Sequence, residues 1–265
     1  MSNLNICVVR NDQIGDVALT SPVLECIKQS WPNCHLTVIA QDTTVPLLQA
    51  MTCVDEVIPD YRQHVRGAYP LLLKHVVQHM KEKKFDRIFF NHFDTLYVLA
   101  AALANIPERI GDANRLGFSA LLTHKITQCW HDFTLHEVDQ QLRLLQPFNA
   151  DVKVKYPEIR VPETAQKEVD QLLRLTKERP YIVLHTTYGK GNRSWGAENY
   201  AELCDYIHST LTMGVVLTGG QADKAMTDVI VERATYKPIN LVAKTTLIEL
   251  VSVIQASACV VGAET

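Results

Sequence analysis

Residues 4–41, LNICVVRNDQIGDVALTSPVLECIKQSWPNCHLTVIAQ, contain a complete strand–loop–helix–strand pattern. An apolar run at residues 6–9 ends in a polar loop, and apolar side chains then recur at helical spacing over residues 17–27. A second apolar run at residues 36–40 completes a βαβ unit. The loop carries Asp16 at the mouth of the predicted helix. This carboxylate is therefore expected at the carboxyl edge of a parallel sheet, where α/β proteins place their chemistry.

Composition narrows the class of protein. The chain has 265 residues, of which 47% are hydrophobic, so it can bury a substantial core. Its formal net charge of −3 gives no global attraction to nucleic acid or anionic lipid. Seven cysteines occur without a CxxC pair, a pattern typical of buried thiols in a reducing compartment. No signal peptide and no apolar window of about 18 residues is evident. We therefore expect a cytoplasmic protein.

Strand-length apolar runs alternate with helical patterns almost from end to end, which predicts an α/β fold with parallel sheets covered on both sides. The first half has predicted strands at residues 4–10, 36–40, 56–58 and 87–90, and predicted helices at 17–30, 43–51, 70–83, 95–104 and 135–145. The second half has predicted strands at residues 181–185, 214–218, 240–242 and 258–261, and predicted helices at 197–211, 222–235 and 246–255.

A charged stretch with two prolines, residues 151–163, separates the halves and predicts a linker at a domain boundary. The expected domains are residues 1–155 and 165–265, each a Rossmann-like lobe. The chain stops directly after a predicted strand, so the second lobe is expected to be incomplete.

The segment LHTTYGKGNRSW, residues 184–195, runs from a predicted strand into a helix. Hydroxyls from Thr186 and Thr187, cations from Lys190 and Arg193, and backbone amides freed by two glycines suit a diphosphate. The GxxxxGK[ST] order of a P-loop is absent. The alternative is a polar surface loop, but the density of hydrogen-bond donors favours phosphate.

A second Gly-containing loop, LTGGQAD at residues 217–223, places Asp223 where it can bind a ribose hydroxyl, although a Gly-Gly turn alone is common. The sequence contains no GxGxxG, D-x-D, HExxH or GxSxG motif, so neither a nicotinamide site nor a metal-held sugar nucleotide is indicated. For Asp16 two interpretations stay open. It is either a carboxylate that stabilises the start of a helix or a general base in a cleft.

Taken in order, these segments resemble the heptosyltransferase family of bacterial glycosyltransferases (family 9, GT-B fold). The resemblance is carried by VVRNDQIGDVALTSPVL, CVDEVIPDY, FDRIFF, NIPERIGDANR and LHEVDQQLRLL in the first half. In the second half it is carried by LHTTYGKGNRSWGAENYAEL, VVLTGGQAD and NLVAKTTLIELVSVIQASACVVGAET. Each motif is loose, but the ordered set spans nearly the whole chain.

The resemblance implies an inverting transfer of a sugar, usually heptose from ADP-heptose, to a lipopolysaccharide core acceptor, with no metal and no cofactor beyond the donor. The first lobe would bind the acceptor and the second the nucleotide sugar. Asp16 matches the catalytic carboxylate. Among the nucleotide-binding positions, Thr186 and Thr187 match the hydroxyls that hold the diphosphate, and Arg193 matches a position that is usually a lysine. Lys244 matches the loop whose backbone contacts the adenine. Glu264 and Thr265 match the start of a motif that contacts the sugar and the phosphates.

Two departures from the family pattern concern the end of the chain. Glu264 stands where aspartate is more usual, and the glycine and histidine that should follow Thr265 are absent, together with the final helices. Alternatives are a family member or fragment that binds nucleotide without turnover, and a different two-domain enzyme such as an epimerase. Acceptor contacts are expected from residues 91–92 and 109–115, although the latter cations can be ordinary surface residues. A lipid-linked acceptor suggests transient contact with the inner membrane surface, yet no amphipathic anchor stands out, and nucleic acid is not an expected partner.

Overall fold

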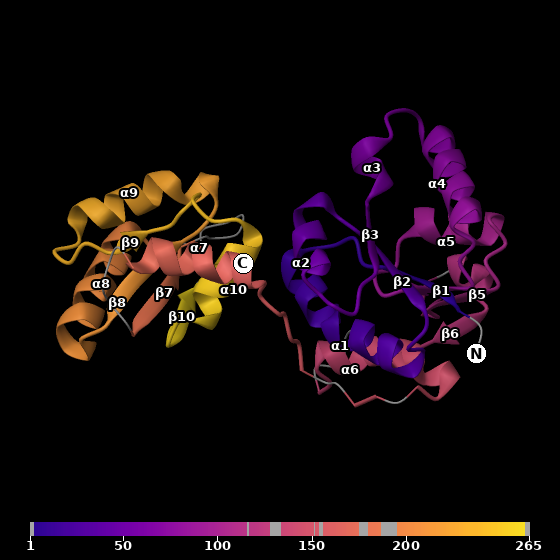
Figure 1. Ribbon diagram of the computed structural model, residues 1–265. Coiled ribbons are helices and arrows are strands. Elements are labelled where there is room, and N and C mark those ends of the chain that lie inside the picture. Colours follow the sequence, from indigo (N-terminus) through magenta and orange to yellow (C-terminus); the bar gives the residue numbers. More distant parts are fainter. Residues whose placement is uncertain are drawn as a thin grey trace. The chain divides into compact units, whose positions relative to one another are not determined.

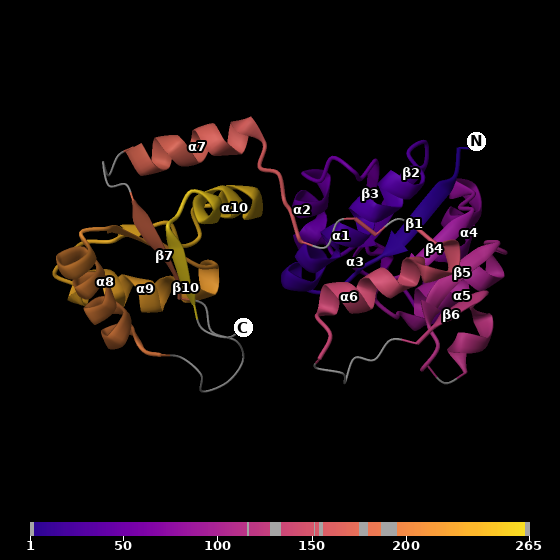
Figure 2. The same ribbon diagram turned by 90° about the horizontal axis from the view of Figure 1, so that it is seen from below.

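The computed structural model describes residues 3–115, 117–127, 134–150, 152–153, 156–174, 180–186 and 195–262. The chain forms two compact units, Met1–Arg160 and Val161–Thr265, in agreement with two Rossmann-like lobes. Figures 1 and 2 show a separate sheet with its own helices in each unit. Each unit is described by itself.

The first unit is built on a six-stranded sheet in the order β3-β2-β1-β4-β5-β6, and every pairing in it is parallel. Its strands are β1 (Asn5–Val9), β2 (His35–Ala40), β3 (Glu56–Pro59), β4 (Arg87–Phe90), β5 (Glu108–Asp112) and β6 (His124–Ile126). Its helices are α1 (Ile14–Ser30), α2 (Val45–Gln49), α3 (Tyr61–His64), α4 (Tyr69–Lys83), α5 (Thr95–Leu103) and α6 (Glu137–Leu142). Short 3₁₀ turns at Asp42–Thr44, Phe118–Leu121 and Arg143–Phe148 complete the unit.

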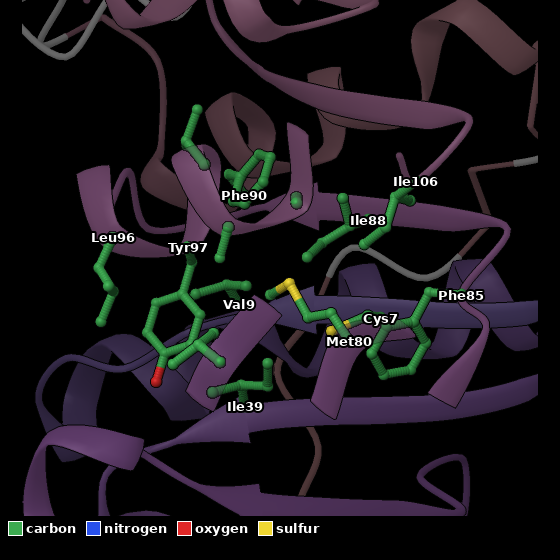
Figure 3. Close-up of a cluster of buried hydrophobic side chains, with 14 of the residues drawn as sticks. Cys7, Val9, Ile39, Met80, Phe85, Ile88, Phe90, Leu96, Tyr97 and Ile106 are labelled. Carbon is green, nitrogen blue, oxygen red and sulfur yellow. The ribbon is translucent and has the colours of Figure 1, made fainter. Parts of the chain in front are cut away.

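Alternating strand residues fill two cores, because successive side chains on a strand point to opposite faces. Cys7 and Val9 of β1 join Ile88 and Phe90 of β4 against helices α4 and α5 (Figure 3). Helices α1 and α6 pack together on the other face of the sheet (Figure 1). All seven apolar residues of β1 and β4 are buried, which is why both strands are continuous hydrophobic runs in the sequence.

The second unit has a four-stranded parallel sheet in the order β10-β7-β8-β9. Its strands are β7 (Tyr181–His185), β8 (Gly214–Thr218), β9 (Ile239–Asn240) and β10 (Cys259–Gly262). Its helices are α7 (Glu163–Arg174), α8 (Ala197–Leu211), α9 (Lys224–Arg233) and α10 (Leu247–Gln255), with a 3₁₀ turn at Gln221–Asp223 before α9. Strand β10 lies at the edge of the sheet, and all four of its residues are exposed.

The expected α/β class with two parallel sheets is confirmed, and most predicted elements lie within a few residues of their observed bounds. Four elements were not predicted from the sequence, namely strands β5 and β6 and helices α3 and α7; α3 has only four residues, too few to show a helical period. Strand β5 (ERIGD) has charged ends and a single aliphatic residue, and β6 has three residues, so neither forms an apolar run. Helix α7 was not predicted because it is mostly polar. It has only a few apolar residues, such as Val169 and Leu173, and these are buried against the second sheet.

Among the described residues, no helix is both long enough and apolar enough to cross a membrane.

Candidate functional site

The order of strands in the first unit fixes where a ligand can approach. The chain leaves β1 toward β2 on one side, whereas β4, reached later, pairs with β1 on the other. In open α/β sheets the crevice lies at this switch point, outside the carboxyl ends of the strands. The loops that follow β1 and β4 run side by side there, since the N–H of His92 donates to the carbonyl of Val9 at 3.0 Å.

Arg10 is the centre of the charged groups at this edge. Its side chain is 3% exposed, and its Nη1 donates to the carbonyl of Asn91 at 2.9 Å. Three carboxylates surround the guanidinium: Asp12 at 2.9 Å, Glu137 of α6 at 3.1 Å and Asp16 of α1 at 3.5 Å. One buried cation therefore holds three acids contributed by the β1 loop, α1 and α6.

Asp16 is the third residue of α1, whose N-cap is Gln13. Its side chain is 36% exposed, the most accessible of the three acids. Burial raises the pKa of Asp16, and the charges of Asp12 and Glu137 act in the same direction, while Arg10 and a backbone hydrogen bond from Gln13 act against them. A carboxylate that is accessible and more basic than usual can accept a proton from a bound hydroxyl.

A network of hydrogen bonds centred on Gln141 holds the elements around Asp16 together. Gln141 of α6 donates to Glu137 at 2.8 Å and accepts from Asn91 at 3.0 Å and from Thr20 at 3.1 Å. The Thr20 hydroxyl also lies 2.9 Å from the carbonyl of Asp16. The loop after β4, helix α6 and the first turn of α1 are thereby joined, so the network fixes the position of the backbone that carries Asp16.

A second charged cluster lies at the same edge of the sheet, next to the loop after β1. Asp60 follows β3 and Asp94 caps α5, and Asn11 donates to these carboxylates at 2.8 and 2.9 Å. Arg62 pairs with Asp60 at 3.2 Å and with Asp94 at 2.6 Å. Burial works to raise the pKa of Asp94, but the hydrogen bonds from Arg62 and Asn11 outweigh it and hold this pKa below its ordinary value.

The residues predicted to meet an acceptor are mostly engaged in the fold. Asn91 is 2% exposed and donates to side chains of the network centred on Gln141. His92 is more open, and its Nδ1 lies 3.2 Å from Asp12. Arg109 donates to the carbonyl of Leu121 at 2.7 Å, so it holds the 3₁₀ turn against β5. The expectation that the cations of residues 109–115 contact an acceptor is thus weakened for Arg109.

In the second unit, Thr186 directly follows β7 and is 1% exposed, with its N–H donating to the carbonyl of Thr218 at 3.1 Å. Asp223 is 6% exposed, and its carboxylate accepts the N–H of Gly220 at 2.7 Å, closing the turn that begins α9. Lys244 lines an open cavity of about 440 Å³ between α7 and α10. Thr187, Lys190, Arg193, Glu264 and Thr265 lie outside the described residues.

Strand β7 lies between β8 and the later strand β10, just as β1 lies between β2 and the later strand β4. The last residues of β7 and β10, His185 and Gly262, pair in register. The switch point of the second sheet is therefore at the ends of these two strands. Burial lowers the pKa of His185, although the charge of Asp223 opposes this. The imidazole is 3.1 Å from the Thr218 hydroxyl.

Sequence reasoning missed Arg10, Asp12 and Glu137 because they are ordinary charged residues, and Glu137 lies more than a hundred positions from the other two. A weak signal existed: Arg10 closes a buried strand, where an unpaired cation is costly and a partner must be supplied. Within the described ranges no group of three or more His, Cys, Asp and Glu side chains is arranged to hold a metal ion.

Two parallel Rossmann-like sheets, each with a switch point in its strand order, define a GT-B-like α/β protein. A family model described as glycosyltransferase family 9 (heptosyltransferase) matches residues 74–265. The chain belongs to this family.

Relatives agree with this assignment. A protein of Haemophilus influenzae, named as a presumed glycosyltransferase, is 25% identical over 227 residues, which are 82% of this chain and 64% of the relative. A family 9 glycosyltransferase of Veillonella parvula has the same fold, with a TM-score of 0.84, 22% identity and coverage of 98% of this chain and 74% of that one. The ADP-heptose lipopolysaccharide heptosyltransferase II of Escherichia coli has a TM-score of 0.76 at 22% identity, covering 99% and 80%. The chain thus spans about two thirds to four fifths of the length of these proteins.

Proposed function

We propose that this chain carries the machinery for an inverting transfer of heptose, or a related sugar, from an ADP-sugar to a lipopolysaccharide core or other glycan acceptor. Family membership supports sugar transfer, and the name of the E. coli neighbour suggests the donor and the acceptor. The observation that carries the proposal is Asp16: a partly exposed carboxylate of raised pKa, at the switch point of the first sheet, beside a fixed arginine.

In the proposed reaction Asp16 acts as the general base. An acceptor hydroxyl attacks the anomeric carbon from the face opposite the leaving group, so a new C–O bond forms while the bond to the β-phosphate oxygen breaks. Asp16 takes the hydroxyl proton as attack proceeds, which is typically worth about 10²–10⁴-fold. Arg10 keeps the carboxylate oriented and Asp12 and Glu137 keep it basic. The diphosphate leaves as a stable anion.

For the second unit we propose the nucleotide half of the site, residues 165–265. Hydrogen bonds from Thr186 and Thr187 and the positive charges of Lys190 and Arg193 would stabilise the charge that grows on the β-phosphate, a role that preorganised donors perform without a metal. Lys244 and its loop would meet the base. Glu264 and Thr265 would meet the sugar and phosphates. Residues 1–155 would bind the acceptor.

Asp223 has a more restricted role than the ribose contact first expected. Its carboxylate already accepts the N–H of Gly220, and a side chain on the neighbouring Gly219 would approach Asp223 Oδ2 to 2.8 Å. The turn is therefore closed tightly around this acid. We propose that Asp223 shapes the Gly-Gly loop, and that any ribose contact uses its remaining lone pairs.

The test is Asp16→Asn, because the amide keeps the shape of the carboxylate and loses its basicity. We expect transfer from ADP-heptose to fall at least 100-fold while the dissociation constant for ADP, measured by calorimetry, stays within twofold. Turnover near that of the unmodified chain would refute the base. Arg193→Ala is expected to weaken ADP binding, and an unchanged dissociation constant would reject that role.

The same experiment separates the alternatives. A member without activity binds ADP but neither transfers nor slowly hydrolyses the donor. An epimerase interconverts the free sugar nucleotide without an acceptor. A thermal-shift screen of ADP, UDP and GDP identifies the nucleotide first, since a ligand at 100 times its dissociation constant stabilises the folded state by about 2.7 kcal/mol.

A further inference from the structure

Gly15 is the second residue of α1 and directly precedes the candidate base Asp16. Glycine inside a helix costs stability, because its backbone loses more freedom on folding than that of any other residue. A fold requires glycine where the backbone adopts a conformation that other residues avoid, or where a neighbouring group leaves no room for a side chain. A helical glycine that meets neither condition is therefore a candidate for a role outside the fold.

Other glycines of this chain meet one of the two conditions. Gly67, Gly117 and Gly196 have φ angles of +136°, +81° and +91°, in the region that favours glycine. A Cβ at Gly219 would lie 2.8 Å from the carboxylate of Asp223, so a side chain there would force the turn open. The fold itself requires these residues.

Gly15 meets neither condition. It lies within the α-helix, and its φ is outside the positive range. Among the described residues, no side chain and no backbone beyond its own helix turn comes within 4 Å of a Cβ built at this position. Gly15 is exposed, and Ile14 beside it is 44% exposed. Alanine would thus fit the described fold without strain.

The open space at Gly15 lies next to the accessible carboxylate of the candidate site. The Cα atoms of Gly15 and Asp16 are about 3.8 Å apart, and Cα–Cβ bonds in a helix tilt toward its N-terminus. The two side-chain directions differ by about 100° around the helix axis. A side chain at position 15 would therefore stand beside the carboxylate at the mouth of α1. Asp16 is 36% exposed there, so a molecule that reaches it passes close to Gly15.

We propose that Gly15 is a specificity-determining residue, which leaves room for the sugar ring of the acceptor while the hydroxyl of that ring is held against Asp16. This inference rests on the proposed function, from which it takes the acceptor and the role of Asp16. A hydroxyl on a saturated ring cannot reach a carboxylate without bringing ring atoms into van der Waals contact with the surroundings, at about 3.5–4.0 Å. A methyl group at position 15 would occupy part of that space.

A side chain at position 15 should have opposite effects on the fold and on the reaction. Gly15→Ala restricts the unfolded chain and fits the helix, so the urea midpoint should rise by about 0.3 M. The KM for the acceptor should rise about tenfold, because the methyl group overpacks the bound ring. Gly15→Leu should lower kcat/KM for the acceptor at least 100-fold. The dissociation constant for ADP should stay within twofold in both variants.

A matched control adds the same methyl group at the other end of α1. Gln29 is exposed in the last turn of this helix, far along the chain from Asp16. The variants Gln29→Gly and Gln29→Ala should differ in urea midpoint in the same direction as the Gly15 pair, with an equal KM for the acceptor. A KM difference as large as that of the Gly15 pair would trace the effect to helix stability and would overturn the proposal. So would a lowered urea midpoint in Gly15→Ala.

Acceptor binding without donor separates this inference from the proposed function. The probe is a heptose-deficient lipopolysaccharide core, titrated into the chain by calorimetry. We expect Asp16→Asn to bind it within threefold of the unmodified chain and Gly15→Ala to bind it at least fivefold more weakly.

Each result decides between the two claims. If Asp16→Asn still transfers sugar while Gly15→Ala loses affinity for the core, the base is wrong and the clearance at Gly15 stands. If both Gly15 variants bind and transfer like the unmodified chain while Asp16→Asn is inactive, the clearance is wrong and the proposed function stands. An unmodified chain that does not bind the core would overturn both.

Discussion

Replacing Arg10 by glutamine tests the electrostatic centre of the candidate site. The guanidinium is 3% exposed and donates to the carbonyl of Asn91 at 2.9 Å, a charged hydrogen bond worth about 1.5–3 kcal/mol. Its nearest acid, Asp12, is 17% exposed, and the other two are about one-third exposed. Those two pairs are partly screened and contribute about 0.5 kcal/mol each. Since glutamine keeps part of the packing, we expect a loss of about 3 kcal/mol.

Urea denaturation measures this loss, provided that the signal reports on the first unit. The chain has three tryptophans. Trp31 packs edge-on against Phe148 with ring centroids 5.6 Å apart, so a background with Trp130 and Trp195 changed to phenylalanine isolates the first unit. With a slope of about 2 kcal/mol per molar urea, the midpoint should fall by about 1.5 M.

The pH dependence gives a second, independent readout. Burial and neighbouring acids already raise the pKa of Asp16, and losing Arg10 should raise it further. An acid whose folded pKa is raised destabilises the fold fully above that pKa and less as pH falls through it. The deficit of Arg10→Gln should therefore be larger at pH 7 than at pH 5. Arg160→Gln, whose exposed pair with Glu158 is 3.5 Å long, should change the midpoint little. A shift under 0.5 M, or an equal deficit at both pH values, would refute this reasoning.

Three further outcomes can be checked directly. Asp12→Asn removes a charge that raises the pKa of Asp16, so the acid limb of the pH profile for transfer should move to lower pH, and an unmoved limb would contradict the coupling. Arg62→Met should lower the free energy of unfolding by about 2 kcal/mol at pH 7, measured by equilibrium denaturation, because the carboxylate of Asp94, only 10% exposed, loses its cationic partner. The pKa of Asp94 is lowered in the folded state, so its ion pair stabilises the fold above about pH 4 and this stabilisation is lost as pH falls through the folded pKa. In strong acid the variant should therefore differ little in stability from the unmodified chain. Of the cysteines in the described ranges, Cys259 alone is exposed and should react fastest with a thiol reagent, and rapid labelling of the others in native buffer would contradict the burial described.

Most of the fold could be predicted from the sequence, because the strands of a parallel sheet that is covered on both faces are continuous apolar runs. Strands β1, β2, β7 and β8 are of this kind, and each was predicted within a residue or two of its bounds. Strand β5 was missed because its inner positions include Gly111, where a Cβ would lie 3.3 Å from Phe90. Glycine at position 111 allows β5 to approach Phe90 of β4 closely, but it also interrupts the apolar pattern by which a strand is predicted.

The candidate site divides in the same way. Asp16 could be found from local pattern, since a carboxylate at the start of a helix after a buried strand already lies at the edge of the sheet. The ion pairs of Arg62 with Asp60 and Asp94 could not be found in this way, because no local pattern links these three residues.

The sequence by itself determined the class of fold, the family and the position of Asp16, because periodicity and ordered local motifs are properties of neighbouring residues. Only the tertiary structure decided that Arg10 gathers Asp12, Asp16 and Glu137, and that Asp223 closes its own turn. The pKa of a carboxylate follows from burial and from charges brought together across the fold, and linear spacing does not encode those distances.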